Sequence, residues 1–444
     1  MAAAKGHELI PSAKRLIRSL RDMGYDFPQA VADVVDNSIE ARSTVVAIDV
    51  EFEGDDSWVR IADNGRGMKP ERLREAMRYG ADREYAKNDL GKFGLGLKTA
   101  SMSQCQRLSV ASRWNRKRSD ITAYTWDLEH IEKTNRWEII PIERNGIGPA
   151  IRHPLRDSIG TVVLWQRLDR ILGYRHPYGE NARKRLSQMC RELEQHLGMV
   201  FQRFLLGEEP GKRLKILLNG NEVRPWDAFC RTEPKTKKLH EIRLPLEYEG
   251  THGEVLIQPF VLPHQDDFSS PEAFRSASGP ANWNQQQGFY IFRAGRMIQS
   301  GGWSNLRAPD EHTKLARIAI SFSPSLDEAF KINVAKMRVQ LPAQIRDTIR
   351  DAIIPVIKLA REVYDRKTPK SALPKTPSQS PEVTPDNLVS PQPFSDSPPV
   401  TSMRISHASP ELLTFDDWTA RVLAAAKPRE RGIVEAVVAR IKKQ

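Results

Sequence analysis

Cysteine is scarce in this sequence, and long hydrophobic runs are missing from it. Three cysteines, Cys105, Cys190 and Cys230, are spread over 444 residues. A disulfide framework or a structural zinc site needs closer pairs, so this spacing excludes both and predicts a reducing compartment. The sequence also lacks a run of about 18 apolar residues, which a membrane helix needs. The N-terminal residues show no apolar segment of a secretory signal, so we expect a cytoplasmic protein without membrane contact.

Positive charge exceeds negative charge along the chain. The formal net charge is +12, and the isoelectric point is near 9.5. The densest basic runs lie at residues 113–118, 183–185 and 235–238. Runs of this kind are more often solvated surfaces than binding patches. The charge balance therefore permits contact with DNA phosphates that does not depend on the DNA sequence, but it does not require such contact.

Residues 1–170 alternate between helical and strand patterns. Asp26-Phe27-Pro28-Gln29 is typical of a helix start, with an acidic N-cap, proline in the first turn and glutamine at the third position. Apolar periodicity predicts helices at 8–24, 27–41, 70–79 and 95–103, and strands at 44–52, 58–62, 106–112, 120–127 and 160–166. This mixture predicts an α+β domain with helices on one face of a sheet.

The rest of the chain divides into three parts. Residues 171–366 predict a second α/β domain, with helices at 183–206 and 341–364 and strands at 214–218, 289–292 and 318–322. Residues 367–410 are rich in proline and serine and predict a disordered linker. Residues 411–444 regain apolar spacing and predict a short helical tail. Such a tail is too short to be stable alone, which favours docking onto a protein partner or another copy of the chain.

Two polar residues stand out in the helix expected at 27–41. Asp33 and Asn37 are four residues apart, so they lie on one helix face, while Val31, Val34 and Ile39 suit a core. An asparagine oxygen can bind a hard cation, and a carboxylate can orient or deprotonate a water. Taken alone, such a pair is usually an ordinary polar face.

Two glycine motifs follow. In the first, Asp63 ends an apolar strand and precedes Gly65, Gly67 and Met68. The glycines allow a sharp turn beside a flat ligand. The Asp63 carboxylate can then accept a hydrogen bond from an exocyclic amine of that ligand. The second runs from Gly91 to Thr99 and places three glycines before a helical pattern, where backbone N–H groups and Lys98 can hold phosphate oxygens. Either motif alone is weak, because most such sequences are simple turns.

In this order, the three motifs resemble the N-box, the D-x-G-x-G box and the glycine lid of the GHKL superfamily of ATPases. The strand beginning at Gly160-Thr161 is similar to the later GT motif of that family. The resemblance covers about residues 8–170. It implies a Bergerat-type α/β sandwich that binds ATP with magnesium.

The family pattern implies a role for each matching residue. Asn37 would hold the magnesium ion, Asp63 would read adenine, and Thr161 would support Asp63 through its hydroxyl. Gly65, Gly67 and Met68 would shape the base pocket. The remaining nucleotide contacts would come from the lid and the helix after it, at Gly91, Lys92, Phe93, Gly94, Leu95, Gly96 and Lys98.

Two further stretches resemble the MORC and MutL branches of the superfamily. Residues 288–298 are similar to the strand–turn–strand of their transducer domain, and residues 331–339 resemble the MutL stretch whose lysine reaches the γ-phosphate, here Lys336. Those relatives carry glutamate where this chain has Asp33. Because aspartate is one methylene shorter, we expect slow hydrolysis, with Asp33 and Lys336 as the catalytic residues.

Three functions fit these motifs. The first is a magnesium-dependent ATPase that dimerises when it binds ATP. The dimer would close as a clamp around DNA, without specificity for the DNA sequence. The second is a chaperone-like ATPase that remodels a protein client. The third is a regulatory ATP-binding module with negligible turnover, suggested by the shorter Asp33. Nearby Asp36 and Glu40 are interpreted as structural, since they lie away from the Asp33 face.

Overall fold

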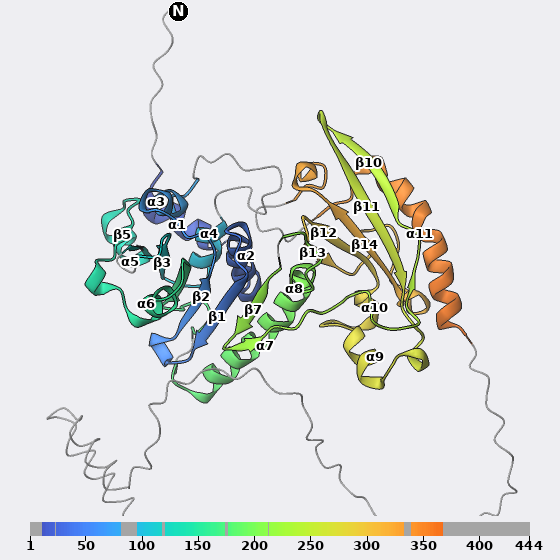
Figure 1. Cartoon of the computed structure of the whole chain (residues 1–444), viewed down its shortest axis with the longest axis horizontal. Helices are drawn as coiled ribbons and strands as arrows, with labels where there is room; N and C mark the ends of the chain where they lie inside the picture. Colours follow the sequence, from blue (N-terminus) through green and yellow to red (C-terminus); the bar gives the residue numbers. More distant parts are fainter. Residues whose placement is uncertain are drawn as a thin grey trace, which may run out of the picture. The chain divides into compact units, whose positions relative to one another are not determined.

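Two β-sheets organise the described part of the chain. The computed structural model describes residues 11–22, 24–80, 96–117, 120–173, 176–211, 213–332 and 339–366. All of them fall within one compact unit, in which Figure 1 shows the two sheets. Each sheet has its own hydrophobic core. We call the part up to Val223 the first subdomain and the part from Arg224 the second subdomain.

The first sheet has eight strands in the order β5-β4-β3-β6-β2-β1-β7-β8. Neighbouring strands are antiparallel except β1 and β7, which are parallel. The strands are β1 (Val45–Glu51), β2 (Trp58–Asp63), β3 (Arg107–Arg113), β4 (Ile121–Asp127), β5 (Ile140–Pro141), β6 (Gly160–Gln166), β7 (Lys215–Leu218) and β8 (Asn221–Glu222).

Helices of the first subdomain pack onto this sheet. Three of them, α2, α4 and α7, share one core with the apolar side chains of β1, β2 and β3. Figure 1 labels these helices and strands. The helices are α1 (Ala13–Arg21), α2 (Phe27–Glu40), α3 (Pro70–Met77), α4 (Gly96–Met102), α5 (Leu128–Thr134), α6 (Pro149–Leu155), α7 (Glu180–Val200) and α8 (Gln202–Leu205). Short 3₁₀ turns occur at Gly54–Asp56 and Arg144–Gly146.

The start of α2 follows the predicted capping box. The Asp26 carboxylate accepts a hydrogen bond from the Gln29 backbone N–H at 2.8 Å, and the Gln29 side chain accepts one from the Asp26 N–H at 3.4 Å. These contacts satisfy two backbone donors that a helix start otherwise leaves open. The cap therefore fixes where α2 begins, and with it the positions of Asp33 and Asn37.

One helix lies on the opposite face of the first sheet. Ile151 and Leu155 of α6 pack in a separate cluster with Ala62, Ala111 and Val162 of the strands. The expectation of helices on one face is therefore wrong in this detail. The physical reason is that β2, β3 and β6 are apolar on both sides, so each side needs a cover.

The first core extends past residue 170. Leu186, Leu193 and Leu197 of α7 and Ile216 of β7 are fully buried in it. The predicted helix at 183–206 is two helices, since α7 ends at Val200 and α8 starts at Gln202. The domain division at residue 170 stays a prediction, and this packing favours a boundary after Val223.

The second sheet has six strands, with β10-β11-β14-β12-β13 in order and β9 paired to β11. Only β12 and β14 pair in parallel among them. The strands are β9 (Lys237–Lys238), β10 (Ile242–Tyr248), β11 (Thr251–Val261), β12 (Gly288–Arg293), β13 (Arg296–Ser300) and β14 (Ala316–Phe322). The helices are α9 (Pro271–Ala277), α10 (Trp283–Gln286) and α11 (Ala343–Tyr364), with 3₁₀ turns at Gln265–Asp267, Glu311–Thr313 and Pro324–Leu326.

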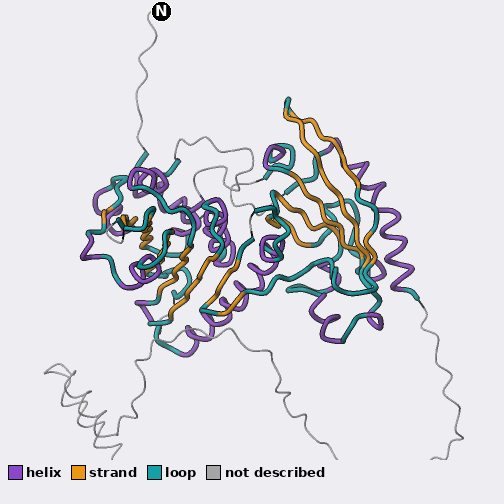
Figure 2. Tube along the Cα trace, viewed as in Figure 1, coloured by secondary structure: helices purple, strands orange, loops and turns teal. Residues whose placement is uncertain are grey.

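Helix α11 covers one face of this second sheet (Figure 1). Its buried positions are Ile345, Ile349, Ile353, Val356 and Ala360, which recur at helical spacing against β10, β11 and β14. The tube view separates the strands of both sheets from the helices around them (Figure 2). In the described ranges, no helix is long and apolar enough to span a membrane.

The α+β fold class is confirmed, and so are most of the predicted elements. The helix at 27–41 and the strands of residues 44–166 match α2, β1, β2, β3, β4 and β6 within one or two residues. The predicted linker (367–410) and tail (411–444) lie outside the described residues. So do residues 8–10 and 23 of the helix predicted at 8–24, in which the structure places α1 (Ala13–Arg21).

Candidate functional site

Helix α2 carries the first two site residues. Asn37 is exposed, and its Nδ2 donates to the Asp33 backbone carbonyl at 3.0 Å. Asp33 is buried, at 3% exposed. The core face predicted for this helix is confirmed, because Val31, Val34 and Ile39 are each at most 4% exposed.

Asp63 ends β2 and receives three hydrogen bonds. The Gly65 N–H donates to its Oδ1 at 2.9 Å, and the Thr161 N–H donates to the same oxygen at 3.2 Å. The Ser38 hydroxyl donates to Oδ2 at 3.1 Å. Since Ser38 follows Asn37 on α2, this contact ties the two motifs together and fixes the direction of the carboxylate.

Burial changes the acidity of Asp63. Loss of solvent raises the pKa of this carboxyl to about 6, although the bonds from Gly65, Ser38 and Thr161 each act to lower it. At neutral pH the group is therefore mostly ionised and can accept a hydrogen bond from a ligand amine.

Thr161 supports Asp63 differently from the expectation. Its backbone N–H makes the contact, while its hydroxyl lies 3.1 Å from the Ser112 hydroxyl. Ser112 also accepts from the Met68 N–H at 2.8 Å. β2 and β6 pair Asp63 directly with Thr161, which brings the backbone N–H to the carboxylate. A part for the Thr161 hydroxyl in the network around Asp63 stays a prediction.

Glycine is required at two positions near Asp63. A Cβ at Gly65 would lie 2.7 Å from the Ala41 Cβ, and one at Gly67 would lie 2.1 Å from the Arg113 carbonyl oxygen. Gly67 also has a φ of +65°, which side-chain-bearing residues rarely adopt. The loop after β2 therefore packs tightly between α2 and the end of β3.

Most of the predicted lid lies outside the described residues. This holds for Gly91, Lys92, Phe93, Gly94 and Leu95, and also for Lys336. Gly96 begins α4, and a Cβ there would lie 3.6 Å from Asp33 Oδ2. The end of the lid sequence and the Asp33 carboxylate are thus neighbours.

Lys98 is buried in the first turns of α4. Its ammonium donates to the Ala76 carbonyl at 3.1 Å and lies 5.9 Å from the Tyr79 ring centroid. Burial lowers the pKa of this ammonium to about 8. A phosphate contact by Lys98 stays a prediction, and it requires the ammonium to turn away from Ala76.

Two residues that the sequence did not single out, Tyr25 and Arg296, contact Asp33. The Tyr25 hydroxyl donates to Asp33 Oδ2 at 2.9 Å, and Arg296 Nη2 of β13 lies 3.3 Å from Oδ1. Arg296 Nε lies 3.0 Å from Asp36 Oδ1. Asp36 was interpreted as lying away from Asp33, but residues three apart on a helix are neighbours. Tyr25 could have been suspected from its place before the helix cap, whereas no sequence signal links Arg296 to Asp33.

Comparison with known families supports this geometry. Residues 25–161 match the family described as histidine kinase-, DNA gyrase B- and HSP90-like ATPases. The matched stretch starts at Tyr25 and ends at Thr161, so it contains Asp33, Asp63 and their described contacts except Arg296. The matched residues thus correspond to a GHKL-type ATPase domain. A search of curated proteins finds no match for the chain.

The residues of this GHKL-type site fit ATP and magnesium. A magnesium ion is usually held by one or two protein oxygens together with substrate phosphates. The exposed Asn37 amide suits this arrangement, because its nitrogen end is used by the Asp33 carbonyl. Among the described residues, no group of three acidic, histidine or cysteine side chains could form a metal site without a substrate.

A hollow of about 570 Å³ lies beside the GHKL-type site. Asn64, Arg113, Arg116, Arg156 and Ser158 are among its lining residues. Arg113 is buried and donates to the carbonyls of Asn115, Leu155 and Arg156, so it is structural. Arg116 and Arg156 are exposed.

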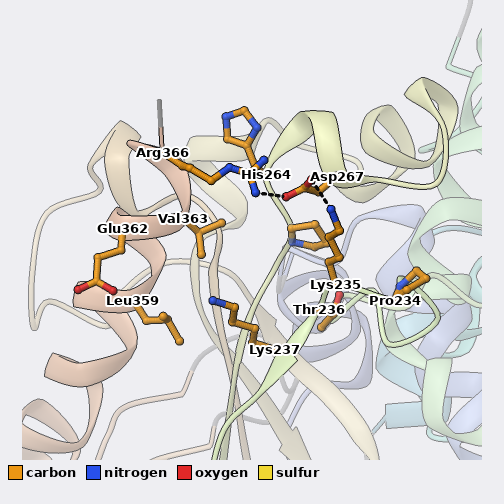
Figure 3. A pocket seen from close by; sticks show the side chains of 11 residues that line it. Pro234, Lys235, Thr236, Lys237, His264, Asp267, Leu359, Glu362, Val363 and Arg366 are labelled. Atoms are coloured by element: carbon orange, nitrogen blue, oxygen red, sulfur yellow. Dashed lines mark hydrogen bonds and ion pairs between the residues drawn. The ribbon is translucent and has the colours of Figure 1, made fainter. Parts of the chain in front are cut away.

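A second hollow, of about 460 Å³, lies in the second subdomain (Figure 3). Lys235 and Arg366 both contact Asp267, each at 2.7 Å, and the bonds from Arg366 and Lys235 lower the pKa of that carboxyl to about 2. Part of the basic run at 235–238 is therefore neutralised by an ion pair, although the Lys235 side chain itself is exposed.

Proposed function

We propose that this chain binds ATP with magnesium through its GHKL-type domain and hydrolyses it slowly. The observation that carries the proposal is the convergence of the Gly65 and Thr161 N–H groups and the Ser38 hydroxyl on one half-buried carboxylate, Asp63. In this proposal the Asp63 carboxylate accepts a hydrogen bond from the adenine amine. Met68, which packs on the first core, closes the base pocket with Gly65 and Gly67.

In the same proposal, residues of α2 and of the lid contact the phosphates of ATP. Asn37 holds magnesium, which neutralises phosphate charge when it is bound. Asp33 acts as the base toward the attacking water. Gly91, Lys92, Phe93, Gly94, Leu95, Gly96 and Lys98 supply lid and helix contacts, and Lys336 reaches the γ-phosphate from the second subdomain.

We further propose a MORC- or MutL-like role, in which ATP binding drives homodimerisation and closes a clamp. The hairpin of β12 and β13 supports this role, because the strand–turn–strand expected at residues 288–298 is present and reaches α2 through Arg296. A nucleotide that orders the site can therefore act on both subdomains. The tail at 411–444 is proposed to dock a protein partner.

Dimerisation is tested by measuring the mass of the full chain in solution. With magnesium and a non-hydrolysable ATP analogue, we expect the wild type to shift from monomer to dimer and Asn37→Ala to stay monomeric, because the variant lacks the magnesium ligand. A wild type that stays monomeric, or a variant that dimerises equally well, contradicts the switch. Glu40→Gln, on the same helix, is the control that should still dimerise.

DNA contact is proposed for Arg116 and Arg156, the exposed arginines of the hollow beside Asn64. Each lost phosphate contact should reduce the slope of log affinity against log salt by about 0.9. We therefore expect Arg116→Ala/Arg156→Ala to weaken DNA binding and to flatten its salt dependence in a filter or anisotropy titration. The control is Lys235→Ala/Lys237→Ala, which removes the same charge from the second subdomain. If both double variants weaken DNA binding equally, the effect comes from net charge and Arg116 and Arg156 do not form a DNA site.

One observation favours a second candidate, a regulatory ATP-binding module with negligible turnover. Both oxygens of Asp33 already contact protein donors, Tyr25 on one and Arg296 on the other. Such a carboxylate is a weaker proton acceptor than a solvated one. Measured turnover decides between the two candidates.

A further inference from the structure

Two loops of the first subdomain meet beside the hollow of about 570 Å³ and share one support, Arg113. Arg113 ends β3 and is 4% exposed. Its guanidinium donates to the carbonyls of Asn115 and Arg116 in the loop after β3. It also donates to the carbonyls of Leu155 and Arg156 at the end of α6. One buried cation therefore satisfies four carbonyls and holds the two loops against each other.

The loop after β2 lies against the same backbone. A Cβ at Gly67 would lie 2.1 Å from the Arg113 carbonyl oxygen, so this loop and the end of β3 are in close contact. Lys69, which also follows β2, places its ammonium 5.2 Å from the ring centroid of Trp114. Trp114 itself is 37% exposed. A single exposed tryptophan needs no explanation, but this one lies between a lysine and a basic loop.

Exposed basic side chains come from all three loops. Arg66 and Lys69 follow β2, Arg116 follows β3, and Arg156 ends α6. The Arg156 side chain donates to Asp157 at 2.9 Å, and both side chains are more than half exposed. An exposed ion pair of this kind contributes little to stability, so a phosphate can take the place of the carboxylate.

These cations can bind the phosphates of any DNA, but they do not distinguish a single strand from a duplex. An aromatic ring does distinguish them, because it stacks on the flat face of an unpaired base. In a duplex, neighbouring base pairs cover these faces. Trp114 and Arg116 are two positions apart, so their Cα atoms are at most about 7 Å apart. The ring and the guanidinium can therefore contact a base and a phosphate of one strand.

We infer that Trp114 is a base-stacking residue, and that the loops after β2, after β3 and at the end of α6 form a surface for single-stranded DNA. This inference rests on the proposed DNA contact of Arg116 and Arg156 and specifies the form of DNA that they bind. Trp114 stacks on a base while the two arginines contact phosphates. Because Arg113 already fixes the loops, little ordering of the protein is needed when the strand binds.

The test compares an oligo-dT strand with a mixed-sequence duplex of equal length, in anisotropy titrations with the full chain. We expect the wild type to bind the strand more tightly than the duplex. Trp114→Leu keeps an apolar side chain beside Lys69 but has no ring. It should bind the strand about 5- to 100-fold more weakly, which is the value of stacking one base, and its affinity for the duplex should stay that of the wild type.

Two readouts separate stacking from charge. Trp114→Leu should keep the wild-type slope of log affinity against log salt, because no phosphate contact is lost, whereas Arg116→Ala/Arg156→Ala should flatten that slope. Trp114→Phe retains a ring and should recover most of the affinity for the strand. Strand binding should quench tryptophan fluorescence in the wild type and should quench it less in Trp114→Phe.

Tyr178→Ala is the matched control. Tyr178 is an exposed aromatic residue of the same subdomain, at 67% exposed. Its ring packs on Gly54, where a Cβ would lie 2.1 Å from it. Gly54 precedes β2 and Gly67 follows it, so Tyr178 lies at the opposite end of that strand. We expect this variant to bind both forms of DNA as the wild type does.

Equal affinity of the wild type for strand and duplex would overturn the inference, and so would a Trp114→Leu variant that binds the strand as tightly as the wild type. Equal weakening on both forms would overturn it as well, because the ring would then support the loops instead of a base. In these cases the DNA contact of Arg116 and Arg156 is still decided by its own salt slope. If the wild type binds neither form, that contact and the strand surface fall together, while ATP binding is measured separately.

Discussion

Asp63→Asn should bind ATP about 100-fold more weakly than the wild type while keeping its fold. The asparagine oxygen can still accept from the Gly65 and Thr161 N–H groups, which converge on Oδ1. Its NH₂ group then takes the place of Oδ2 and faces the adenine amine, donor against donor. A lost hydrogen bond to a charged group costs about 1.5–3 kcal/mol, and about 2.7 kcal/mol corresponds to the 100-fold loss.

The measurement is a calorimetric or fluorescence titration with ATP and GTP at several pH values. The wild-type affinity should fall as pH drops through about 6, because the raised pKa of Asp63 makes its carboxylate take up a proton there. Asp63→Asn should lack this dependence and should prefer ATP over GTP less. An unchanged affinity for ATP would show that Asp63 does not contact the base.

Asp49→Asn is the matched control for this prediction. It neutralises a buried carboxylate of the same sheet, which is 5% exposed and pairs with Arg60 at 2.7 Å. Asp49 belongs to β1 and has no predicted part in nucleotide binding. We expect this variant to lose stability while its affinity for ATP and its pH dependence stay those of the wild type.

Local signals explain why the sequence predicted much of the first subdomain. The Asp26–Gln29 capping box fixes the start of α2, and the strand before Asp63 is short, apolar and followed by glycine. Both signals lie within a few residues, where propensity and capping act directly. They suffice to place Asn37 and Asp63 at the ends of their elements.

The β10–β11 hairpin shows where local signals are weak. Its strands alternate apolar and polar residues, but Pro245 and Pro259 interrupt them, and proline argues against a strand. The turn at Glu249-Gly250 has positive φ at both residues, +47° and +75°, although glutamate rarely adopts this conformation. Pairing of β10 and β11 over seven residues outweighs both local penalties.

The contacts of Asp33 depend on long-range packing. Asp33 and Arg296 are separated by 263 positions in the chain. The sequence identified the hairpin of residues 288–298 as an element, yet nothing in it indicates which helix its arginine meets. That pairing arises because β13 packs near α7 and α8, which belong to the first subdomain. Tertiary contact, in short, determines the charge environment of the proposed base.

Asp33→Asn should reduce kcat by about 10²–10⁴-fold, which is the usual contribution of a general base, and should leave the affinity for ATP nearly unchanged. The amide can keep both local contacts, because its oxygen accepts from Arg296 and its NH₂ can donate to the Tyr25 oxygen. The fold of α2 is therefore preserved, and the loss of proton acceptance is isolated. Single-turnover hydrolysis and nucleotide titration on the same preparation separate the two effects.

Asp33→Glu tests the same assignment in the opposite direction. The added methylene extends the reach of the carboxylate, and Gly96 carries no side chain beside it, since a Cβ there would lie 3.6 Å from Asp33 Oδ2. If Asp33 is a base limited by its short reach, turnover should rise. If Asp33→Asn and Asp33→Glu both leave kcat at the wild-type value, Asp33 is not the base. A wild-type kcat near zero that Asp33→Glu cannot raise favours the regulatory ATP-binding module, in which the carboxylate serves structural contacts such as those with Tyr25 and Arg296.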